Sequence, residues 1–207
     1  MAEEHHEAMQ WEDALSRQDL KHAAHCLLYY MEVIGERHQL YALMQVRSDG
    51  LIGFPGGHID EGEEISETGI VAGLNRELTE EMNLGDEYHV PSHEDHYVCS
   101  HHNTHKGLVC HFYHMPMTKD QFERSEQQHS TARDFPSESL GLFRVPVFWT
   151  VAPHGEKDFR HPDNNKFWSV FMGYPFCGNS RHQLLITLLR LGIVNQDFVT
   201  LVSPPHE

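Results

Sequence analysis

The sequence has few positive charges and no long apolar run. Its 207 residues include 15 Lys and Arg against 31 Asp and Glu, which gives a formal net charge of −16. Such a chain repels polyanions, which argues against a nonspecific nucleic-acid coat protein and means that an anionic ligand needs a local cation. No stretch approaches the ~18 apolar residues of a membrane helix. The first thirteen residues are acidic rather than basic, so we expect neither a signal peptide nor a transit peptide.

Cysteines are also scarce. The chain has four, at positions 26, 99, 110 and 177, and none of them form a C-x-x-C pair. A chain of this size does not need disulfides, so we expect free thiols in a reducing compartment. No linker, internal repeat or low-complexity tract interrupts the sequence. We therefore predict an acidic N-terminal segment over residues 1–18 that could be mobile, a single domain over 19–200 and a tail over 201–207.

The apolar patterns predict several strands and only a few helices. Residues 23–33 and 40–47 are apolar runs separated by a polar turn, which predicts paired strands. Further strands are expected over 97–100, 108–115 and 140–147, and helices over 119–128 and 181–191. A capping box between Ser180 and Gln183 is expected to start the last helix, and residues 153–178 to form a long ordered loop. This order of elements is typical of an α+β or sandwich fold.

The histidines are unusually many. There are 19, with a dense group between residues 93 and 114. The group lacks the paired spacing of zinc ligands, so we interpret these histidines as surface polar residues without a shared role.

One further helix carries the clearest chemical signal. Val71, Leu74, Leu78 and Met82 recur at helical spacing and predict an apolar stripe. Asn83, which tolerates left-handed backbone geometry, is the expected end of this helix.

On that helix Glu77, Glu80 and Glu81 project from one polar face. Like charges at this spacing repel, and a divalent cation among them would turn the repulsion into attraction. Carboxylate oxygens are hard ligands, which favours Mg²⁺ or Mn²⁺. Arg76 can orient Glu77 through an ion pair. The alternative is an ordinary solvated acidic face.

The residues upstream favour metal binding over a solvated face. They read Gly53-Phe54-Pro55-Gly56-Gly57, and their glycines let the backbone approach a ligand closely. Loop and helix together resemble the Nudix box of Nudix hydrolases, which reads glycine, five residues, glutamate, seven residues, Arg-Glu-apolar-x-Glu-Glu-x-Gly-apolar. Residues 76–84 meet the second half of this pattern, with Asn83 in place of glycine.

The first half of the box differs in its spacing. Five residues separate Gly57 from Glu63, as in the pattern, but twelve rather than seven separate Glu63 from Arg76. A five-residue extension of the loop before the helix is the simplest explanation. Keeping seven residues would put Gly62 and Thr68 in the first-half positions and lose the carboxylate, so we rank that register second. We assign no catalytic role to Glu63.

The resemblance covers about residues 22–189. Within the family, the chain resembles the Nudix enzymes that decap a small nucleolar RNA and hydrolyse inosine diphosphates. This resemblance is found in residues 22–30, 51–57, 73–78 and 140–146. It implies an α/β/α sandwich with a mixed β-sheet and metal-dependent hydrolysis of a nucleoside diphosphate linked to another group. The metal ligands that it implies are the Gly56 carbonyl, Glu77, Glu80, Glu81, His101 and Glu138. Which of the three helix glutamates is a ligand and which is the base stays open.

The resemblance also implies substrate contacts, at His25, Arg47, Phe54, Asn179 and Gln183. Phe54 would stack on a base, Arg47 would offset phosphate charge, and amide or imidazole groups would read a purine edge. Each residue also has an ordinary structural explanation, such as core packing for Phe54 and helix capping for Asn179 and Gln183.

These observations predict a Mg²⁺- or Mn²⁺-dependent hydrolase of capped small nucleolar RNA, capped mRNA and (deoxy)inosine diphosphate. The resemblance implies a homodimer in the nucleus (nucleolus and nucleoplasm) and cytoplasm, and we expect no DNA or membrane partner. The alternative is a non-catalytic or weakly catalytic RNA-binding Nudix-like protein with a basic strip at Lys157, Arg160 and Lys166. A calcium-binding domain over residues 60–64 lacks EF-hand spacing. All three helix glutamates are present, which favours the enzyme.

Overall fold

A computed structural model describes residues 6–151, 154–160 and 162–202. The strands are β1 (His6–Met9), β2 (Lys21–Ile34), β3 (Arg37–Arg47), β4 (Ile52–Gly53), β5 (Gly56–His58), β6 (Tyr97–Asn103), β7 (Leu108–Pro116), β8 (Ser139–Val151) and β9 (Lys157–Asp158). The α-helices are α1 (Trp11–Ser16), α2 (Glu67–Met82), α3 (His93–His96), α4 (Lys119–Gln128), α5 (Pro162–Phe171), α6 (Ser180–Arg190) and α7 (Gln196–Val202). Two 3₁₀ turns, η1 (Asp86–Tyr88) and η2 (His129–Thr131), complete the described elements.

The strands form one mixed sheet with the order β1-β6-β7-β2-β3-β8-β9, and β4 and β5 pair with β3 and β2. Strands β2 and β7 are parallel, whereas β2 is antiparallel to both β3 and β5. The expected strand pair over residues 23–33 and 40–47 is therefore confirmed, and the expected helix over 119–128 coincides with α4. The other three expected strands also form, each longer than predicted.

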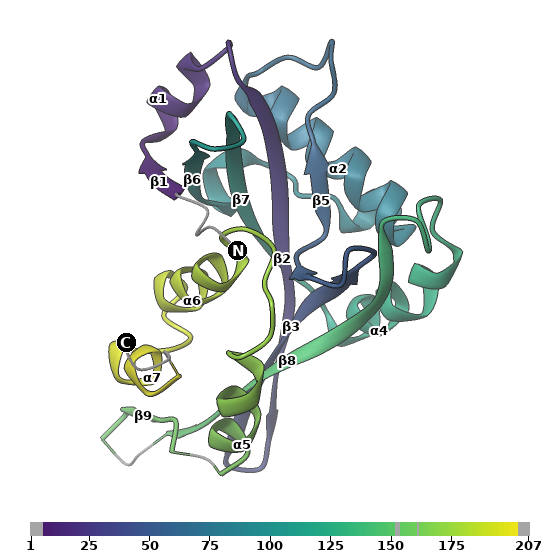
Figure 1. Ribbon diagram of the computed structural model, residues 1–207. Coiled ribbons are helices and arrows are strands. Elements are labelled where there is room, and N and C mark those ends of the chain that lie inside the picture. Colours follow the sequence, from purple (N-terminus) through teal and green to yellow (C-terminus); the bar gives the residue numbers. More distant parts are fainter. Residues whose placement is uncertain (1–5, 152–153, 161, 203–207) are drawn as a thin grey trace.

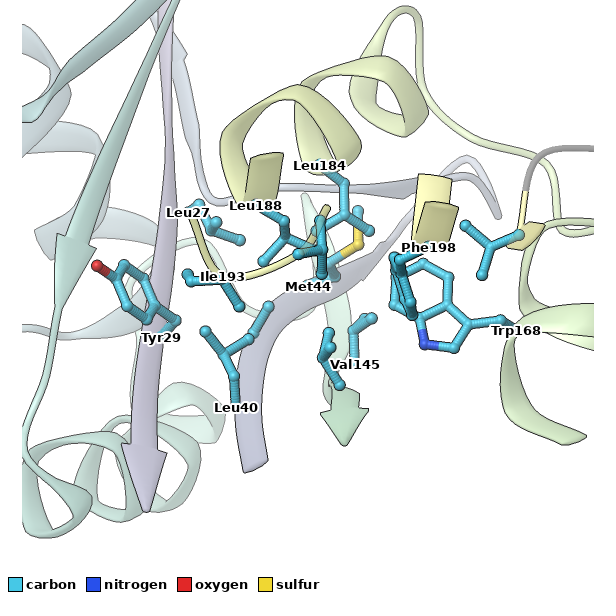
Figure 2. Packing of buried hydrophobic residues seen from close by; sticks show 14 of the residues in the cluster. Leu27, Tyr29, Leu40, Met44, Val145, Trp168, Leu184, Leu188, Ile193 and Phe198 are labelled. Atoms are coloured by element: carbon cyan, nitrogen blue, oxygen red, sulfur yellow. The ribbon is translucent and has the colours of Figure 1, made fainter. Parts of the chain in front are cut away.

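Helices cover both faces of the sheet (Figure 1). On one face α2 and α4 pack through Leu74, Leu78 and Phe122 against β2 residues such as Leu28. On the other face α5, α6 and α7 supply the second apolar cluster, which Figure 2 shows around Leu27, Met44, Trp168, Leu184 and Phe198. Figure 1 thus shows the α/β/α sandwich that the resemblance implies.

The predicted apolar stripe of α2 is confirmed, because Val71, Leu74, Leu78 and Met82 are all buried. The helix starts at Ser66, whose side chain accepts a hydrogen bond from the Gly69 backbone N–H. It ends as predicted at Asn83, whose φ of 53° lies in the left-handed region.

The expected long loop over 153–178 is wrong, because this stretch contains α5. Trp168 and Phe171 are each 1% exposed and hold the helix against the sheet. The fully buried Asn164 fixes its start: its amide donates to the Phe148 and Phe159 carbonyls and accepts from the Phe148 N–H. Local sequence gave no clear apolar period here, so tertiary packing decides the helix.

The expected capping box at Ser180 also does not form. The N-cap of α6 is Asn179, with φ −94° and ψ 10°, and it makes no side-chain capping hydrogen bond. With Asn179 as the N-cap, the third helical residue is His182, so Gln183 lies one residue beyond the position of a capping-box partner.

The acidic N-terminal segment contributes to the sheet from residue 6 onward. Strand β1 pairs antiparallel with β6, and Trp11 of α1 packs on the rings of His93 and Tyr97. Residues 1–5 and 203–207 of the expected terminal segments lie outside the described residues. Within the described part of the chain, no helix is both long and apolar enough to span a bilayer. The four cysteines, all described, form no disulfide.

The interpretation of the histidine group as surface residues is wrong for His101 and His111, which are both buried, and His111 pairs with a further buried histidine outside the group, His22. His22 and His111 are 1% and 0% exposed and share a 2.9 Å contact between Nδ1 of His22 and Nε2 of His111. The Nδ1 atom of His111 lies 2.8 Å from the Ser100 hydroxyl, which in turn accepts from Tyr97. Burial, together with the nearby His22, lowers the pKa of His111 to about 3, so both rings stay neutral at pH 7.

We expect the buried histidine pair to make the fold sensitive to acid. His111 does not take up a proton in the folded state, whereas an unfolded histidine does so below pH ~6.5. The contribution of His111 to the free energy of unfolding is therefore fully present above pH ~6.5. It is lost as the pH falls toward 3, and the loss is about 2 kcal/mol at pH 5. Urea unfolding at pH 7 and pH 5 should show a smaller pH dependence for His111→Gln than for the parent chain. The exposed His105→Gln is the control, and equal slopes for both variants would contradict this role.

Asn164 gives a second test of the fold. In Asn164→Asp the carboxylate cannot donate, so two buried carbonyls lose their hydrogen bonds and a charge is buried beside them. We expect the free energy of unfolding to fall by at least about 2 kcal/mol. The matched substitution Asn165→Asp, on the exposed neighbour, should change it by less than about 0.5 kcal/mol. Similar values for both variants in urea unfolding would show that Asn164 does not anchor α5.

Candidate active site

Helix α2 presents its glutamates to the sheet unequally. Glu81 is 1% exposed and Glu77 is 9% exposed, whereas the side chain of Glu80 is 23% exposed. Glu77 and Glu81 are four residues apart and therefore lie on the same line along the helix. Because Leu74 and Leu78 seat α2 on the sheet, this line of carboxylates is pressed against the loop that carries the glycines.

The glycine loop has room for those carboxylates because it lacks side chains. Gly56 has a φ of 125°, and a Cβ on it would lie 2.2 Å from the Ala24 carbonyl oxygen. A Cβ on Gly57 would lie 2.5 Å from Oε2 of Glu77. The backbone N–H of Gly56 donates to Oε2 of Glu81 at 2.7 Å. A side chain on Gly56 would therefore collide with the β2 backbone, and one on Gly57 would displace the Glu77 carboxylate.

The carboxylates repel one another across this junction. Burial raises the pKa of Glu81 to about 8, and the charges of Glu77 and Glu138 add to the rise, against hydrogen bonds from Gly56 and Gln45. Burial likewise raises the pKa of Glu77, partly offset by Arg76 and reinforced by Glu138 and Glu80. The structure thus brings Glu138, 57 residues after Glu81 in the sequence, within electrostatic reach of both helix glutamates.

Arg76 balances part of this charge. Its guanidinium contacts Glu77 at 2.8 Å, Glu80 at 3.2 Å and Glu63 at 3.1 Å, and donates to the His58 carbonyl at 2.9 Å. Glu63 also accepts from the Asp60 N–H at 2.7 Å. This geometry favours the extended register, in which the loop over residues 59–66 folds back along α2. Glu63 has a role in it that the sequence left open, which is to hold Arg76 beside Glu77 and Glu80.

Glu80 has different surroundings from the other two. One of its carboxylate oxygens pairs with Arg76 and the other with Arg133, from the segment before β8. The Asp134 N–H donates to the Glu80 backbone carbonyl at 3.1 Å, which fixes this segment to α2. Helical spacing alone could not separate the three glutamates, but their neighbours do: Glu77 and Glu81 face the glycine loop, and Glu80 faces two arginines.

A cavity of about 460 Å³ opens on the other side of the glycine loop. The predicted site residues that line it are His25, Arg47, Gly56, Glu138, Asn179 and Gln183, joined by Gly57, His58, Asn103, Lys106, Cys110 and Cys177 among others. Glu77 and Glu81 stand behind Gly56 and Gly57, which form part of the cavity wall. Residues from β1, β2, β3, β5, β6, β7 and α6, together with Glu138 just before β8, thus meet at one cavity.

The residues of the cavity that the sequence predicts to contact substrate differ in charge. Burial and the neighbouring Arg47 and His58 lower the pKa of His25 to about 4, so its ring is neutral at pH 7. The Arg47 guanidinium pairs with Asp49 at 3.2 Å. Gln183 is 4% exposed and lies on the first turn of α6, close to Asn179. The cavity lining therefore offers two cations, Arg47 and Lys106, and several neutral donors and acceptors.

Phe54 is not at the cavity. Its ring is 1% exposed, belongs to the core cluster beneath α6 and packs at 4.8 Å on Phe112. No ring face is open to a base, so the expected stacking role does not fit. The core explanation, equally available from the sequence, is the one that the structure supports.

His101 is also apart from the carboxylates. Its row across the sheet runs through Cys110 and Ala23 to His58, so three strand spacings, roughly 14 Å, separate it from β5. Its ring is 4% exposed and meets the His182 ring edge-on at 5.6 Å. Burial and the charges of His182, His6 and Arg190 lower its pKa to about 4. A role as metal ligand with the glutamates does not fit this position.

The remaining donor set fits a hard divalent cation in its chemistry. Glu77, Glu81 and Glu138 provide oxygen ligands, and their mutual repulsion is the energy that a cation would relieve. Among the described residues, no group of three or more His, Cys, Asp or Glu side chains is arranged so that it could hold a metal ion. The reason is visible in the contacts: Glu77 is turned to Arg76, and Glu81 to Gly56 and Gln45.

Sequence reasoning did not single out Gln45 or Arg133. Gln45 is an isolated polar residue within an apolar strand, which was the available signal for a buried role. Arg133 had no signal, because only folding brings it to Glu80, 53 residues away.

Comparison with known proteins agrees with this geometry. A family model described as Nudt16-like, U8 snoRNA-decapping enzyme-like, matches residues 22–194. A U8 snoRNA-decapping enzyme from Mus musculus is 33% identical over 191 residues, covering 90% of each chain. A Tudor-interacting repair regulator protein from Gallus gallus is 32% identical over 182 residues, covering 85% of this chain and 51% of that protein.

A solved structure supports the fold. A MutT/nudix family protein from Enterococcus faecalis has a TM-score of 0.51 at 10% identity, covering 89% of this chain and 68% of that one. The sheet with helices on both faces, the box on α2 and the family match over residues 22–194 lead to one assignment. The chain belongs to the Nudt16-like family of Nudix proteins, to which the U8 snoRNA-decapping enzymes are related.

Proposed function

We propose that this chain is a metal-dependent Nudix pyrophosphohydrolase. Its substrates are nucleoside diphosphate-linked compounds, namely the 5′ caps of small nucleolar RNA and mRNA and (deoxy)inosine diphosphate. The observation that carries the proposal is the buried pair Glu77 and Glu81, pressed against a glycine loop that lines a nucleotide-sized cavity, with Glu138 also at the cavity. Its named relatives include U8 snoRNA-decapping enzymes, which supports the choice of capped RNA.

The residues have separate tasks in this proposal. Glu77, Glu81 and Glu138, with the Gly56 carbonyl, would hold Mg²⁺ or Mn²⁺, the kind of divalent metal that Nudix proteins typically use. When bound, such a cation neutralises phosphate oxygens and acidifies the attacking water. Arg76 keeps Glu77 in place through its ion pair. A carboxylate in this group accepts the proton of the water that attacks phosphorus.

The residues on the opposite wall of the cavity recognise the nucleotide. The neutral His25 ring and the Gln183 amide can each donate or accept a hydrogen bond at a purine edge. Arg47 lies where it can offset phosphate charge in a molecule that otherwise repels anions. Asn179 brings the start of α6 to the same cavity.

The oligomeric state of the protein and its location in the cell also need a proposal. We propose a homodimer that acts in the nucleus, including nucleolus and nucleoplasm, and in the cytoplasm, since the relatives named as decapping enzymes act on a small nucleolar RNA.

A second candidate function is binding without turnover. It is favoured by the similarity to a protein named as a Tudor-interacting repair regulator, which shows that relatives include a protein named for an interaction. Against it stands the complete acidic set, since Arg76, Glu77, Glu80 and Glu81 are all present and mutually arranged.

Replacing Glu81 tests the proposed chemistry. We expect Glu81→Gln to lower kcat for inosine diphosphate with Mg²⁺ by at least about 100-fold, because the variant lacks a metal-binding and proton-accepting group. The fold should persist, since the amide is isosteric and removes repulsion from Glu77 and Glu138. Phosphate release and thermal unfolding are the two measurements.

The exposed Glu87→Gln serves as the control for this substitution. Full turnover in Glu81→Gln would rule out the proposed metal site. A parent chain that binds capped RNA but hydrolyses none of the substrates would instead support the binding-only function.

A substrate panel tests recognition. Inosine diphosphate, guanosine diphosphate and capped RNA are compared at one Mg²⁺ concentration, with the parent chain and with His25→Ala and Gln183→Ala. We expect inosine diphosphate and capped RNA to have the higher kcat/KM, and each variant to lose about 10-fold, from one lost hydrogen bond to the base. Equal rates for all bases, unchanged in the variants, would remove the recognition roles of both residues.

A further inference from the structure

Gln45 is a polar side chain in the apolar core beside the candidate site. It lies on β3, on the same sheet face as Leu43, and is 0% exposed. Its amide nitrogen lies 3.4 and 3.3 Å from the two carboxylate oxygens of Glu81 and 3.3 Å from the Phe54 carbonyl oxygen. The side chain therefore touches the helix carboxylate and the glycine loop at the same time.

The orientation of the amide is fixed by these partners. A flipped amide would point its oxygen at the Phe54 carbonyl oxygen, which can only accept, and would leave its nitrogen without a partner. In the observed orientation both N–H groups face acceptors. Among the described residues the amide oxygen has no hydrogen-bond partner, and a buried unpaired acceptor costs free energy that an apolar residue of similar shape would not cost. Its favourable contacts are all with the site.

We infer that Gln45 is a positioning residue for Glu81. Together with the Gly56 N–H it holds the Glu81 carboxylate at the wall of the cavity, and it ties the same carboxylate to the backbone of the glycine loop at Phe54. The inference rests on the proposed function for its catalytic consequence. Residues that orient a metal-binding carboxylate typically affect metal affinity or activity by 10- to 100-fold.

The chain contains a matched control on the same strand. Gln39 lies six residues earlier on the same sheet face, is 2% exposed and also leaves its amide oxygen without a partner. It too donates to a carboxylate, but to Glu32, which is paired with Lys119 and belongs to neither the cavity nor the glycine loop. The two glutamines thus share burial and chemistry and differ in the carboxylate that they hold.

The experiment compares Gln45→Leu and Gln45→Met with Gln39→Leu and Gln39→Met in the full chain. Binding of Mn²⁺ without substrate is measured by electron paramagnetic resonance of the free ion, and kcat and KM for inosine diphosphate are measured at saturating Mn²⁺. For the Gln45 variants we expect Mn²⁺ affinity and kcat each to fall by about 10- to 100-fold, with KM for the nucleotide within about twofold. For the Gln39 variants all three values should stay within about twofold.

Thermal unfolding of each variant separates positioning from folding. The methionine variants preserve side-chain length and serve if either leucine variant fails to fold. Gln45 variants that match the Gln39 variants in both Mn²⁺ affinity and kcat would overturn the inference. Failure of the proposed function would look different: the parent chain would show no turnover, and the Mn²⁺ comparison would still decide whether Gln45 positions Glu81. A parent chain that bound no Mn²⁺ would overturn both.

Discussion

The buried carboxylate of Glu81 is the constraint on which the rest of the site depends. Ionising a carboxyl group with 1% exposure is costly unless hydrogen bonds or a cation compensate the charge, and this cost raises its pKa. The Gly56 N–H and the Gln45 amide provide part of that compensation. Both partners come from the sheet, so the position of the carboxylate depends on how α2 is seated. The apolar stripe of α2, although remote from any chemistry, therefore determines where the charge lies.

The two faces of the sheet contribute different parts of the site. The α2 face supplies the carboxylates, and the α6 face supplies the cavity with His25 and Gln183. They meet at β5, where Gly56 and Gly57 carry no side chains. The β2 backbone and the Glu77 carboxylate can therefore both come close to the β5 backbone. A side chain at either position would collide with β2 or with Glu77. The need for glycine at position 56 follows both from its φ of 125° and from the close approach of the β2 backbone.

The arginines distribute the charge among the acidic residues. Arg76 binds Glu63, Glu77 and Glu80 from one guanidinium, and Arg133 takes the second oxygen of Glu80. Glu80 is thereby compensated by cations of the chain itself, whereas Glu77 and Glu81 retain a raised pKa through burial and mutual repulsion. This asymmetry makes Glu77 and Glu81 the stronger candidates to hold a metal. The sequence does not reveal the difference, because the three side chains are identical and lie on one helix face.

The sequence alone determined the elements whose signals are local. The stripe from Val71 to Met82, the left-handed end at Asn83 and the strands on either side of Gly35 all follow from neighbouring residues, and so did the family. Helix α5 was missed because its burial depends on distant partners, including the Asn164 contacts with Phe148. Tertiary structure alone decided that Glu138 and Gln45 reach Glu81, that Phe54 belongs to the core and that His101 lies three strands away. Spacing along a chain specifies which side of an element a residue occupies, but only packing specifies what it faces.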